Sequence, residues 1–366
     1  MRNSKITWSI VAGVALALIV GIGVAIAVGR GSSEPAAAPV VSASVVPLPS
    51  SAPSVSASPA PSPGADIKGP LDLVLIGVDT RVSIPDWEPH ADTIMLLHVE
   101  ADLRSAYLYS LPRDLRVDIP AYQKSGFGGG KHKITEAMSR GSRIPGSEKK
   151  SVEQGYELLT KTLSAYTGIK TFHGGAILNF GGLDKLVDQL GGIDMKIDQK
   201  VKSRHRKPDG SMRTLSGGDY IGPQATYQPG TRHLVGWQAI DYARQRYGLP
   251  NGDYDRQRHQ RQMVEAILAK ALTQGLSDPA KLGSVINALG KSLVYVGGRT
   301  PFEYAYALRD LSPDKITTVT LPGAGVGSGG GYLGEQLKEE GRGFVKALAK
   351  GTHRAYLAAH PKLVDK

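Results

Sequence analysis

LDLVLIGVD, residues 71–79, is dominated by leucine, valine and isoleucine and has the length of a buried strand. Two similar runs follow it, TIMLLHVE at 93–100 and SAYLYSL at 105–111, with the charged turn ADLR between them. Apolar runs of this kind are typical of strands that are covered on both faces. The three runs therefore predict a sheet at the centre of an α/β domain.

Charged residues stand where two of these strands end. Asp79 and Arg81 follow the first strand, and Arg113 and Asp114 follow Pro112 after the third. Ligands of open α/β sheets collect at the carboxyl ends of strands. These positions are therefore candidate site residues.

The chain after the third strand alternates between helical and strand patterns. Helices are expected at 151–168, 181–192, 234–246, 256–275, 279–291, 301–310 and 335–350. Further strands are expected at 175–180, 193–197 and 316–321. The polar stretch 199–230 predicts a hairpin excursion, and GAGVGSGGG at 323–331 predicts a flexible segment. We expect one α/β domain over about 69–360.

The N-terminal part predicts a membrane anchor. ITWSIVAGVALALIVGIGVAIAV, residues 6–28, carries no charge and is long enough to span a bilayer. Basic residues within the tail 1–5 place that tail in the cytoplasm and the rest outside the cell. A cleaved signal peptide is the alternative, although its apolar core is normally shorter. Residues 29–68, rich in Ala, Ser and Pro, predict an extended linker.

Composition narrows the possible partners. The chain has no cysteine, which excludes disulfides and thiolate chemistry. Of its net charge of +11, +9 falls on residues 69–366. A basic domain suits nucleic acid, an anionic membrane or an anionic polymer. Because the anchor places this domain outside the cell, nucleic acid is the poorest candidate.

YARQRYGLPNGDYDRQRHQRQ, residues 242–262, concentrates five arginines. Projected at about 100° per residue, Arg256 and Gln260 share a face with the apolar residues of the following helix. Arg258 and His259 project away from that face. A buried charge needs a partner, and a helix start favours an anion. The pattern predicts that Arg256 and Gln260 face a bound anion.

The arginines of this stretch divide into two groups. Arg244, Arg246 and Arg256 favour anion binding, because planar guanidinium groups hold phosphate oxygens in pairs and suit a diphosphate. For all five arginines the alternative is an ordinary solvated helix face. For Arg258 and Arg261 this alternative and anion binding are equally favoured.

Asp79 and Asp92 flank the passage from the first strand to the second. Carboxylates near phosphates can bridge to Mg²⁺, which prefers oxygen ligands. Each residue can equally cap a turn. Walker, GxSxG and HExxH motifs are absent from the sequence, so the corresponding enzyme classes have no support.

Several longer motifs resemble the LytR–CpsA–Psr (LCP) family. They are LVLIGVDTR, ADTIMLLHV, LYSLPRDLRVDIP, KHKITEA, GGLDKLVDQLGGIDM and AIDYARQRYGLPNGDYDRQRHQRQ. The resemblance runs in order over most of 71–272, and the segment to about 350 is compatible with it. It implies a single mixed-sheet α/β/α domain behind one membrane anchor.

The resemblance also implies an activity. LCP enzymes transfer a glycopolymer, such as teichoic acid, capsular polysaccharide or arabinogalactan, from a polyprenyl-diphosphate-linked donor. The acceptor is a muramic acid hydroxyl of peptidoglycan, and polyprenyl diphosphate is expected to depart. The cofactor implied is Mg²⁺, with Mn²⁺ as its substitute.

Site roles are carried over by motif. Asp79 and Asp92 correspond to the metal-binding carboxylates. Asp92 is the first candidate for the base, and Asp79 is the second. The diphosphate would be held by Arg81, Arg113, Arg244, Arg246, Arg256 and Gln260. The residues assigned to catalysis are Asp92, Arg113, Arg244, Arg246 and Arg256. The family's apolar lipid pocket would draw on Leu159, Leu163, Leu186, Val187 and Leu190, which ordinary core residues would also resemble.

Three positions depart from the family pattern. His90 replaces an arginine two residues before Asp92, and KIN reads Lys133-Ile134-Thr135. His259 replaces a frequent arginine, a mild change if its side chain faces outward.

Two rival functions stay open. One is a pyrophosphatase that cleaves polyprenyl diphosphates without an acceptor. The other is a non-catalytic, membrane-tethered protein that binds anionic wall polymer.

Overall fold

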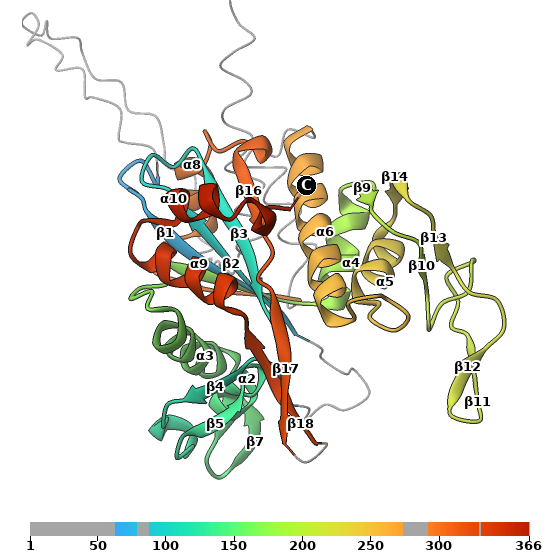
Figure 1. Cartoon of the computed structure of the whole chain (residues 1–366), viewed down its shortest axis with the longest axis horizontal. Coiled ribbons are helices and arrows are strands. Elements are labelled where there is room, and N and C mark those ends of the chain that lie inside the picture. Colours follow the sequence, from blue (N-terminus) through green and yellow to red (C-terminus); the bar gives the residue numbers. More distant parts are fainter. Residues whose placement is uncertain (1–62, 79–87, 274–291, 329–330, 366) are drawn as a thin grey trace, which may run out of the picture.

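A six-stranded sheet forms the centre of the molecule (Figure 1). The computed structural model describes residues 63–78, 88–273, 292–328 and 331–365. The strand order is β15-β8-β1-β2-β3-β16. The strands are β1 (Leu71–Val78), β2 (Ala91–Val99), β3 (Ala106–Leu111), β8 (Gly174–Asn179), β15 (Leu293–Gly297) and β16 (Ile316–Val319).

The sheet is mixed, as the resemblance implied. β1 pairs antiparallel with β2, from Leu71 opposite Val99 to Val78 opposite Ala91. It pairs parallel with β8 on its other side. β2–β3 and β8–β15 are antiparallel, and β3–β16 is parallel. The carboxyl end of β1 and the amino end of β2 therefore meet at the same edge of the sheet.

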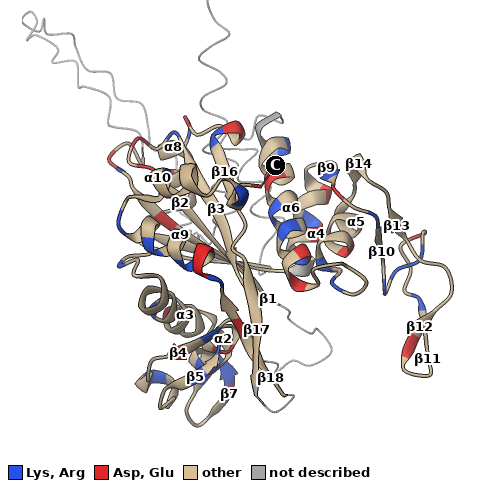
Figure 2. Cartoon of the chain, viewed as in Figure 1, with Lys and Arg blue, Asp and Glu red and all other residues tan. Residues whose placement is uncertain are grey.

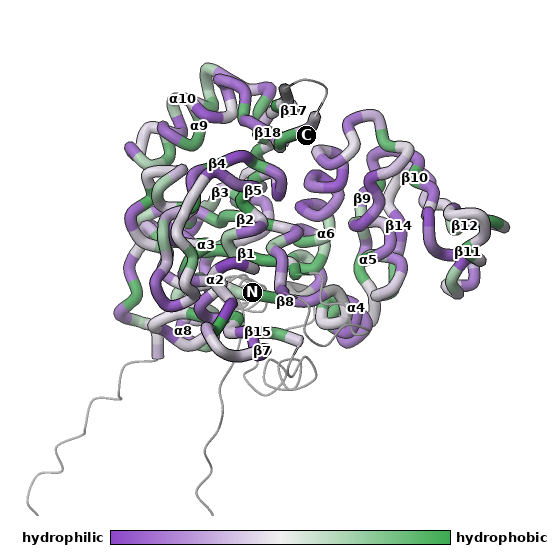
Figure 3. The backbone as a smooth tube through the Cα atoms, turned by 90° about the horizontal axis from the view of Figure 1, so that it is seen from below, coloured by the Kyte–Doolittle hydropathy of each residue, from purple (hydrophilic) through white to green (hydrophobic). Residues whose placement is uncertain are grey.

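Both faces of the sheet are buried, which explains the unbroken apolar runs. Leu73 and Leu75 of β1 belong to one core cluster, and Val74 and Ile76 belong to the other. Figure 3 shows β1 and β2 as hydrophobic segments inside the molecule. A strand covered on both faces needs apolar side chains at every position.

In the described part of the chain, four helices cover one face of the sheet. They are α4 (Phe180–Gln189), α5 (Gly236–Arg244), α6 (Asp253–Thr273) and α8 (Pro301–Ala307). The Asn179 side chain accepts from Gly182 N at 2.8 Å and so fixes the start of α4 directly after β8. A capping box of Thr300 and Glu303 starts α8.

The other face carries α2 (Thr135–Ser142), α3 (Val152–Thr167), α9 (Glu339–Ala349) and α10 (His353–Ala359). Ser151 caps α3 by accepting from Gln154 N at 3.2 Å, and Gly168 ends the helix with a φ of 82°. Beneath these helices, β4 (Arg116–Ile119) pairs with β5 (Gly130–Lys133).

Residues 193–234 form an arm of short strands beside α4 and α5. The hairpin excursion predicted at 199–230 is thus confirmed. β9 (Ile193–Ile197) pairs with β14 (Gly230–Leu234), and β10 (Val201–Lys202) pairs with β13 (Thr226–Tyr227). The hairpin of β11 (Thr214–Ser216) and β12 (Asp219–Ile221) lies farthest from the sheet (Figure 1).

Two expectations are wrong. The glycine-rich segment expected to be flexible contains β17 (Gly323–Ser328), which pairs with β18 (Gly331–Leu337). The helix expected at 335–350 begins only at Glu339, because residues 335–337 belong to β18. Backbone pairing along this hairpin outweighs the low strand propensity of glycine.

Other expectations fall outside the described residues. Among them are the helix at 279–291, the tail and anchor at 1–28, and most of the linker at 29–68. Among the residues that the structure describes, no helix has the length and apolar character needed to cross a bilayer.

Candidate functional site

Asp92 and Arg113 meet at the edge of the sheet. Ile94 of β2 pairs with Leu111 of β3, so the register brings Asp92 and Arg113 opposite each other, two residues further on. The Arg113 guanidinium donates to the Asp92 carboxylate. The structure thus joins two residues that lie 21 positions apart in sequence.

The turn after Arg113 is held by the Lys133-Ile134-Thr135 motif. Thr135 N donates to the Arg113 carbonyl at 3.1 Å. Lys133 Nζ lies 3.4 Å from an oxygen of Asp114. This motif therefore positions the backbone of the Arg113 turn, and it does so with threonine in place of the usual asparagine.

Arg256 reaches the same edge from α6. Arg256 is 7% exposed. Its Nη2 donates to the Asp92 carbonyl at 3.2 Å and lies 2.7 Å from Asp253 Oδ1. Burial lowers the pKa of Arg256 and nearby Arg113 adds to this, while Asp253 and Asp92 oppose it. An arginine still keeps its charge at neutral pH. Its buried Nε has no hydrogen-bond partner within the described structure, so this donor suits an incoming anion.

A polar cavity of about 720 Å³ opens beside these residues. Five of the predicted site residues line it, namely Asp92, Arg113, Arg244, Arg246 and Arg256. Figure 2 shows basic residues on α6 and along the facing arm. Several guanidinium groups around one cavity favour an anion with more than one charge, such as a diphosphate.

A second, apolar cavity of about 50 Å³ lies between the sheet and helices α4, α5 and α6. It is lined by Leu75, Met95, Leu178, Leu186 and Val264, among others. Ile240 and Arg244 line both cavities, so the two adjoin. The arrangement places an apolar slot directly behind a cationic cavity.

Gln260 faces the apolar cavity and does not line the polar one. Its residue is 4% exposed and its Oε1 has no hydrogen-bond partner within the described structure. The inward projection of Arg256 and Gln260 is thus confirmed. Their side chains nevertheless serve different cavities, because Gln260 lies one helical turn further along α6.

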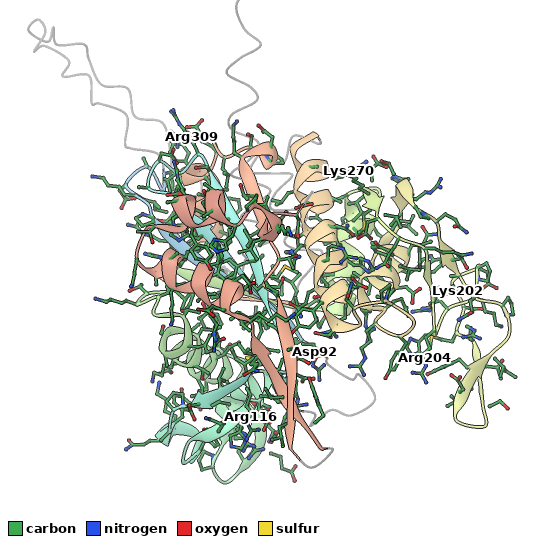
Figure 4. All side chains as sticks on the ribbon, viewed as in Figure 1. Asp92, Arg116, Lys202, Arg204, Lys270 and Arg309 are labelled. Carbon is green, nitrogen blue, oxygen red and sulfur yellow. The ribbon has the colours of Figure 1, made fainter. Side chains whose placement is uncertain are left out.

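The arm contributes cavity residues that the sequence reasoning missed. Arg204, His205 and Arg206 line the polar cavity, together with Trp237 and Tyr247. Figure 4 shows Asp92 at the end of the sheet and Arg204 on the arm. The basic run RHRK at 204–207 was the signal in the sequence. It stood in a stretch interpreted only as a polar hairpin.

Tyr247 stands at the rim of the polar cavity between two arginines. The guanidinium carbons of Arg204 and Arg246 lie 4.3 and 4.9 Å from the centre of its ring. A hydrogen bond from Arg246 lowers the pKa of the Tyr247 phenol. These contacts orient the exposed Arg246 toward the cavity.

The remaining predicted positions divide as follows. Asp79 and Arg81 lie outside the described residues, so their place in the site stays a prediction. His90 lines the polar cavity, and its Nδ1 lies 2.9 Å from the Glu88 carbonyl oxygen. Arg258 pairs with Asp198 at 2.5 Å and does not line the polar cavity.

Two further residues of this stretch are buried, so the outward projection of His259 is wrong and the surface alternative left open for Arg261 does not hold. His259 is fully buried, and its ring stacks on Tyr242 with centroids 4.4 Å apart. Arg261 is 2% exposed and pairs with Asp365 at 2.8 Å. The arm and the C-terminal segment cover faces of α6 that the helical projection treated as open.

The candidate lipid residues are also split by the sheet. Leu186 lines the apolar cavity, and Val187 and Leu190 pack in the core cluster on the same face. Leu159 and Leu163 lie in the cluster on the opposite face. The last two therefore cannot contribute to this cavity.

Residues 48–343 match the family model of the LytR_cpsA_psr family. The chain belongs to this family.

Curated relatives of this LytR_cpsA_psr chain include the cell wall biosynthesis protein LcpA of Corynebacterium glutamicum. It is 28% identical over 287 residues, which cover 72% of this chain and 52% of LcpA. The polyisoprenyl-teichoic acid–peptidoglycan teichoic acid transferase TagU of Enterococcus faecalis is 30% identical over 206 residues, covering 56% and 55% of the two chains. The chain thus spans about half the length of these relatives.

Solved structures share the fold of this LytR_cpsA_psr chain. TagU of B. subtilis superposes with a TM-score of 0.52 at 21% identity, covering 78% of this chain and 97% of TagU. The gbs0355 protein of Streptococcus agalactiae gives a TM-score of 0.58 at 22% identity, with coverage of 78% and 88%. The mixed α/β architecture is therefore that of known LytR_cpsA_psr structures.

Proposed function

We propose that this chain is a phosphotransferase that moves a glycopolymer from a polyprenyl-diphosphate-linked donor to a muramic acid hydroxyl of peptidoglycan. The hydroxyl oxygen attacks the phosphorus that bears the glycan, and a phosphodiester forms. The bond from that phosphorus to the bridging oxygen breaks, and the hydroxyl proton goes to a base. Transfer of glycosyl-1-phosphate leaves one phosphate on the lipid. The leaving group is therefore polyprenyl monophosphate, and the diphosphate expected from the resemblance does not balance.

One observation carries the proposal: a cavity lined by arginines adjoins an apolar slot at Ile240 and Arg244. A lipid-linked diphosphate has the same two parts, a charged head and an apolar chain. The slot is narrow, so a long prenyl chain must separate its walls as it enters. The relative TagU is a polyisoprenyl-teichoic acid–peptidoglycan teichoic acid transferase, which supports transfer of this kind, and LcpA supports a role in cell wall biosynthesis.

The arginines have the main catalytic role in this proposal. Arg113, Arg244, Arg246 and Arg256 hold the diphosphate and stabilise charge that develops on the leaving phosphate. The unpartnered Nε of buried Arg256 is a preorganised donor for that charge. Arg81 is assigned to the same ligand, whereas Gln260 lines the adjoining apolar cavity and is no longer assigned to the diphosphate.

A divalent cation fits the residues at this edge. Asp92 supplies a hard carboxylate oxygen beside the arginines, and Mg²⁺ is typically held by one or two carboxylates together with substrate phosphates. Asp92 and Asp79 would hold Mg²⁺, or Mn²⁺ in its place. The bound ion would neutralise diphosphate charge. We assign the proton of the acceptor hydroxyl to Asp92, with Asp79 as the alternative.

We propose that the protein works at the outer face of the cytoplasmic membrane. A polyprenyl donor is a component of the bilayer, and its acceptor is outside the cell. Residues 6–28 would anchor the chain with its N-terminus in the cytoplasm, and 29–68 would tether the domain.

The test compares arginine variants of the full chain. Incubation with a lipid-linked glycan, peptidoglycan oligomers and Mg²⁺ is followed by mass spectrometry of the products. We expect Arg244→Ala and Arg256→Ala each to lower transfer by about 100-fold or more, the effect of removing one charge-stabilising donor. Arg232→Ala is the matched control, because Arg232 is exposed and, among the described residues, donates to the backbone carbonyls of Gln228 and Pro229. Normal transfer by both site variants, with circular dichroism unchanged, would refute the assignment.

Two product patterns distinguish the rival functions. Release of polyprenyl monophosphate without any glycan–peptidoglycan product would indicate a pyrophosphatase. Binding of wall polymer that persists in chelator, with no turnover of the donor, would indicate a non-catalytic binder.

A further inference from the structure

A second polar cluster lies at the opposite end of the sheet from the candidate site. His98 is the last residue but one of β2, and Glu100 follows directly after the strand. Asp92 lies near the start of β2. His98 lies six positions after Asp92 along the strand, about 20 Å at the usual rise. His353, the first residue of α10, completes the cluster. One donor atom from each of His98, Glu100 and His353 lies within 4.8 Å of the others.

His98 is held in one orientation by a carboxylate. Its Nδ1 lies 2.8 Å from Asp72 Oδ1, and the residue is 7% exposed. The ionised carboxylate accepts a hydrogen bond from Nδ1, which leaves Nε2 as the basic nitrogen. Histidine ligands of metals show the same arrangement, because the carboxylate fixes the tautomer and raises the basicity of the ligand.

His353 is buried and incompletely satisfied. Its residue is 3% exposed, and its Nε2 lies 2.8 Å from Glu100 Oε1. Its Nδ1 is buried without a hydrogen-bond partner among the described residues. The rings of His98 and Tyr107 lie edge-on to it, at 5.1 and 4.7 Å between centroids. A buried polar atom without a partner is costly in an interior of this kind.

Glu100 provides the oxygen donor. Both its contact with His353 and the hydrogen bond from Arg354 Nε, at 2.9 Å, use Oε1. Arg354 covers the solvent side of the cluster, where its side chain is 63% exposed. It fixes the orientation of the carboxylate, and because its guanidinium is itself positive, it must move into solvent when a cation binds Oε1.

We propose that His98, Glu100 and His353 bind a zinc ion. Two imidazole nitrogens and one carboxylate oxygen form a donor set that Zn²⁺ accepts, with a water as fourth ligand. Zinc–ligand bonds of about 2.0–2.2 Å place tetrahedral donors about 3.3 Å apart. The donors here need only small side-chain rotations to reach that spacing. Mg²⁺ avoids imidazole, so this site and the Asp92 edge select different metals.

The zinc site would fasten the C-terminal segment to the sheet. Residues 361–365 follow α10 directly, and Leu363 accepts from Thr320 N at 2.8 Å. Asp365 then pairs with Arg261 of α6. We therefore expect zinc to raise the thermal stability of the folded chain without entering the transfer reaction.

The test uses the full chain, stripped with a chelator and kept in excess Mg²⁺ to saturate the Asp92 edge. Zinc is titrated by calorimetry, and Co²⁺ is substituted to record the d–d absorption of a tetrahedral nitrogen–oxygen site. We expect one zinc per wild-type chain and a higher melting temperature. Asp72→Asn is expected to weaken zinc about 10–100-fold, the usual effect of losing such a supporting carboxylate. His98→Gln and His353→Gln are expected to abolish the site.

His233→Gln is the matched control, because its ring also contacts a carboxylate, Asp194 at 2.9 Å, but on the exposed arm. Zinc stoichiometry unchanged in both His98→Gln and His353→Gln would overturn the proposal. If the variants fail to fold, the wild-type spectrum decides. Octahedral Co²⁺ absorption, or no binding by folded wild-type protein, would equally overturn it.

Discussion

Arg256 and Arg261 stand five residues apart on α6, and their surroundings give them opposite roles. Both are buried. Arg261 is paired with Asp365 and donates to Thr320, so its charge is satisfied within the chain. Arg256 keeps a buried Nε without a partner beside the polar cavity. At the scale of the residue, a structural arginine has its guanidinium hydrogen-bonded within the chain, whereas a binding arginine keeps a donor available for a ligand.

His259 supports a prediction about stability. Its ring is fully buried, stacks on Tyr242 and lies 3.3 Å from Asp198 Oδ1. We expect His259→Ala to lower the free energy of unfolding by about 2–4 kcal/mol, because it removes a packed ring and leaves a cavity. Urea denaturation measures the change.

The control for this prediction is His233→Ala on the exposed arm, for which a change within about 0.5 kcal/mol is expected. If the two substitutions lowered the free energy of unfolding equally, the outward orientation of His259 expected from the sequence would be supported instead.

The sequence predicted the inward residues of α6 better than the outward ones. Projection at 3.6 residues per turn placed Arg256 and Gln260 correctly, because the sheet covers their face. It misplaced His259, since β9 and the residues after it cover a second face. An apolar periodicity in the sequence marks the helix face that has the largest buried contact. A second face that is covered by a polar arm shows no such periodicity.

At the scale of the element, Glu157 joins α3 to the turn that follows β4. It accepts from Tyr122 Oη at 2.7 Å and from Lys124 Nζ at 2.7 Å, and Lys161 Nζ lies 2.9 Å away. Hydrogen bonds from Lys124, Lys161 and Tyr122 lower the pKa of Glu157 to about 2.

This depressed pKa predicts a pH dependence. A carboxylate whose pKa is lower in the folded state stabilises the fold above its unfolded pKa of about 4.5 and loses that contribution as the pH falls toward 2. Glu157→Gln is therefore expected to reduce stability at neutral pH. The difference from wild type should shrink between pH 4.5 and 2.

Denaturant unfolding across this pH range checks the prediction. Glu148→Gln is the control, an exposed glutamate on β7 (Ser147–Lys150). A difference between Glu157→Gln and wild type that stays constant with pH would contradict the assigned contacts.

Elements with local patterns were predicted well, and those built from distant pairing were not. The apolar runs and capped helices of the sheet region follow from spacing and end residues. β17 and β18 form from glycine-rich sequence, because a backbone ladder needs only a partner strand at the right distance. Local propensity contains no information about such a partner.

At the scale of the whole molecule, the adjoining cavities predict separate effects on head and tail of the ligand. Ala243 lines the apolar cavity and is 2% exposed. Ala243→Leu is expected to fill the cavity. Each methylene kept out of it forfeits about 0.8 kcal/mol, so excluding two lowers affinity about ten-fold.

Transfer from a long-chain donor should therefore fall in Ala243→Leu, while transfer from a short, water-soluble donor stays near wild type. Kinetics with both donors measure this contrast. Equal loss with the two donors would show that the cavity does not hold the chain.

The sequence identified the arginines of the site but not the wall that faces them. Arg113, Arg244 and Arg256 stood in long motifs, whereas Arg204 and His205 reach the cavity only through the folding of the arm. Cavities that form between distant segments have no linear signature.

The link between Asp365 and Arg261 sets an order of events during synthesis. A chain that leaves the ribosome from its N-terminus exposes α6 about a hundred residues before Asp365 emerges, as their separation of 104 positions shows. Until then Arg261 has no carboxylate from this segment, and α6 lacks its final fastening to the sheet. The helix that carries Arg256 and Gln260 thus completes its contacts only after Asp365 has been synthesised.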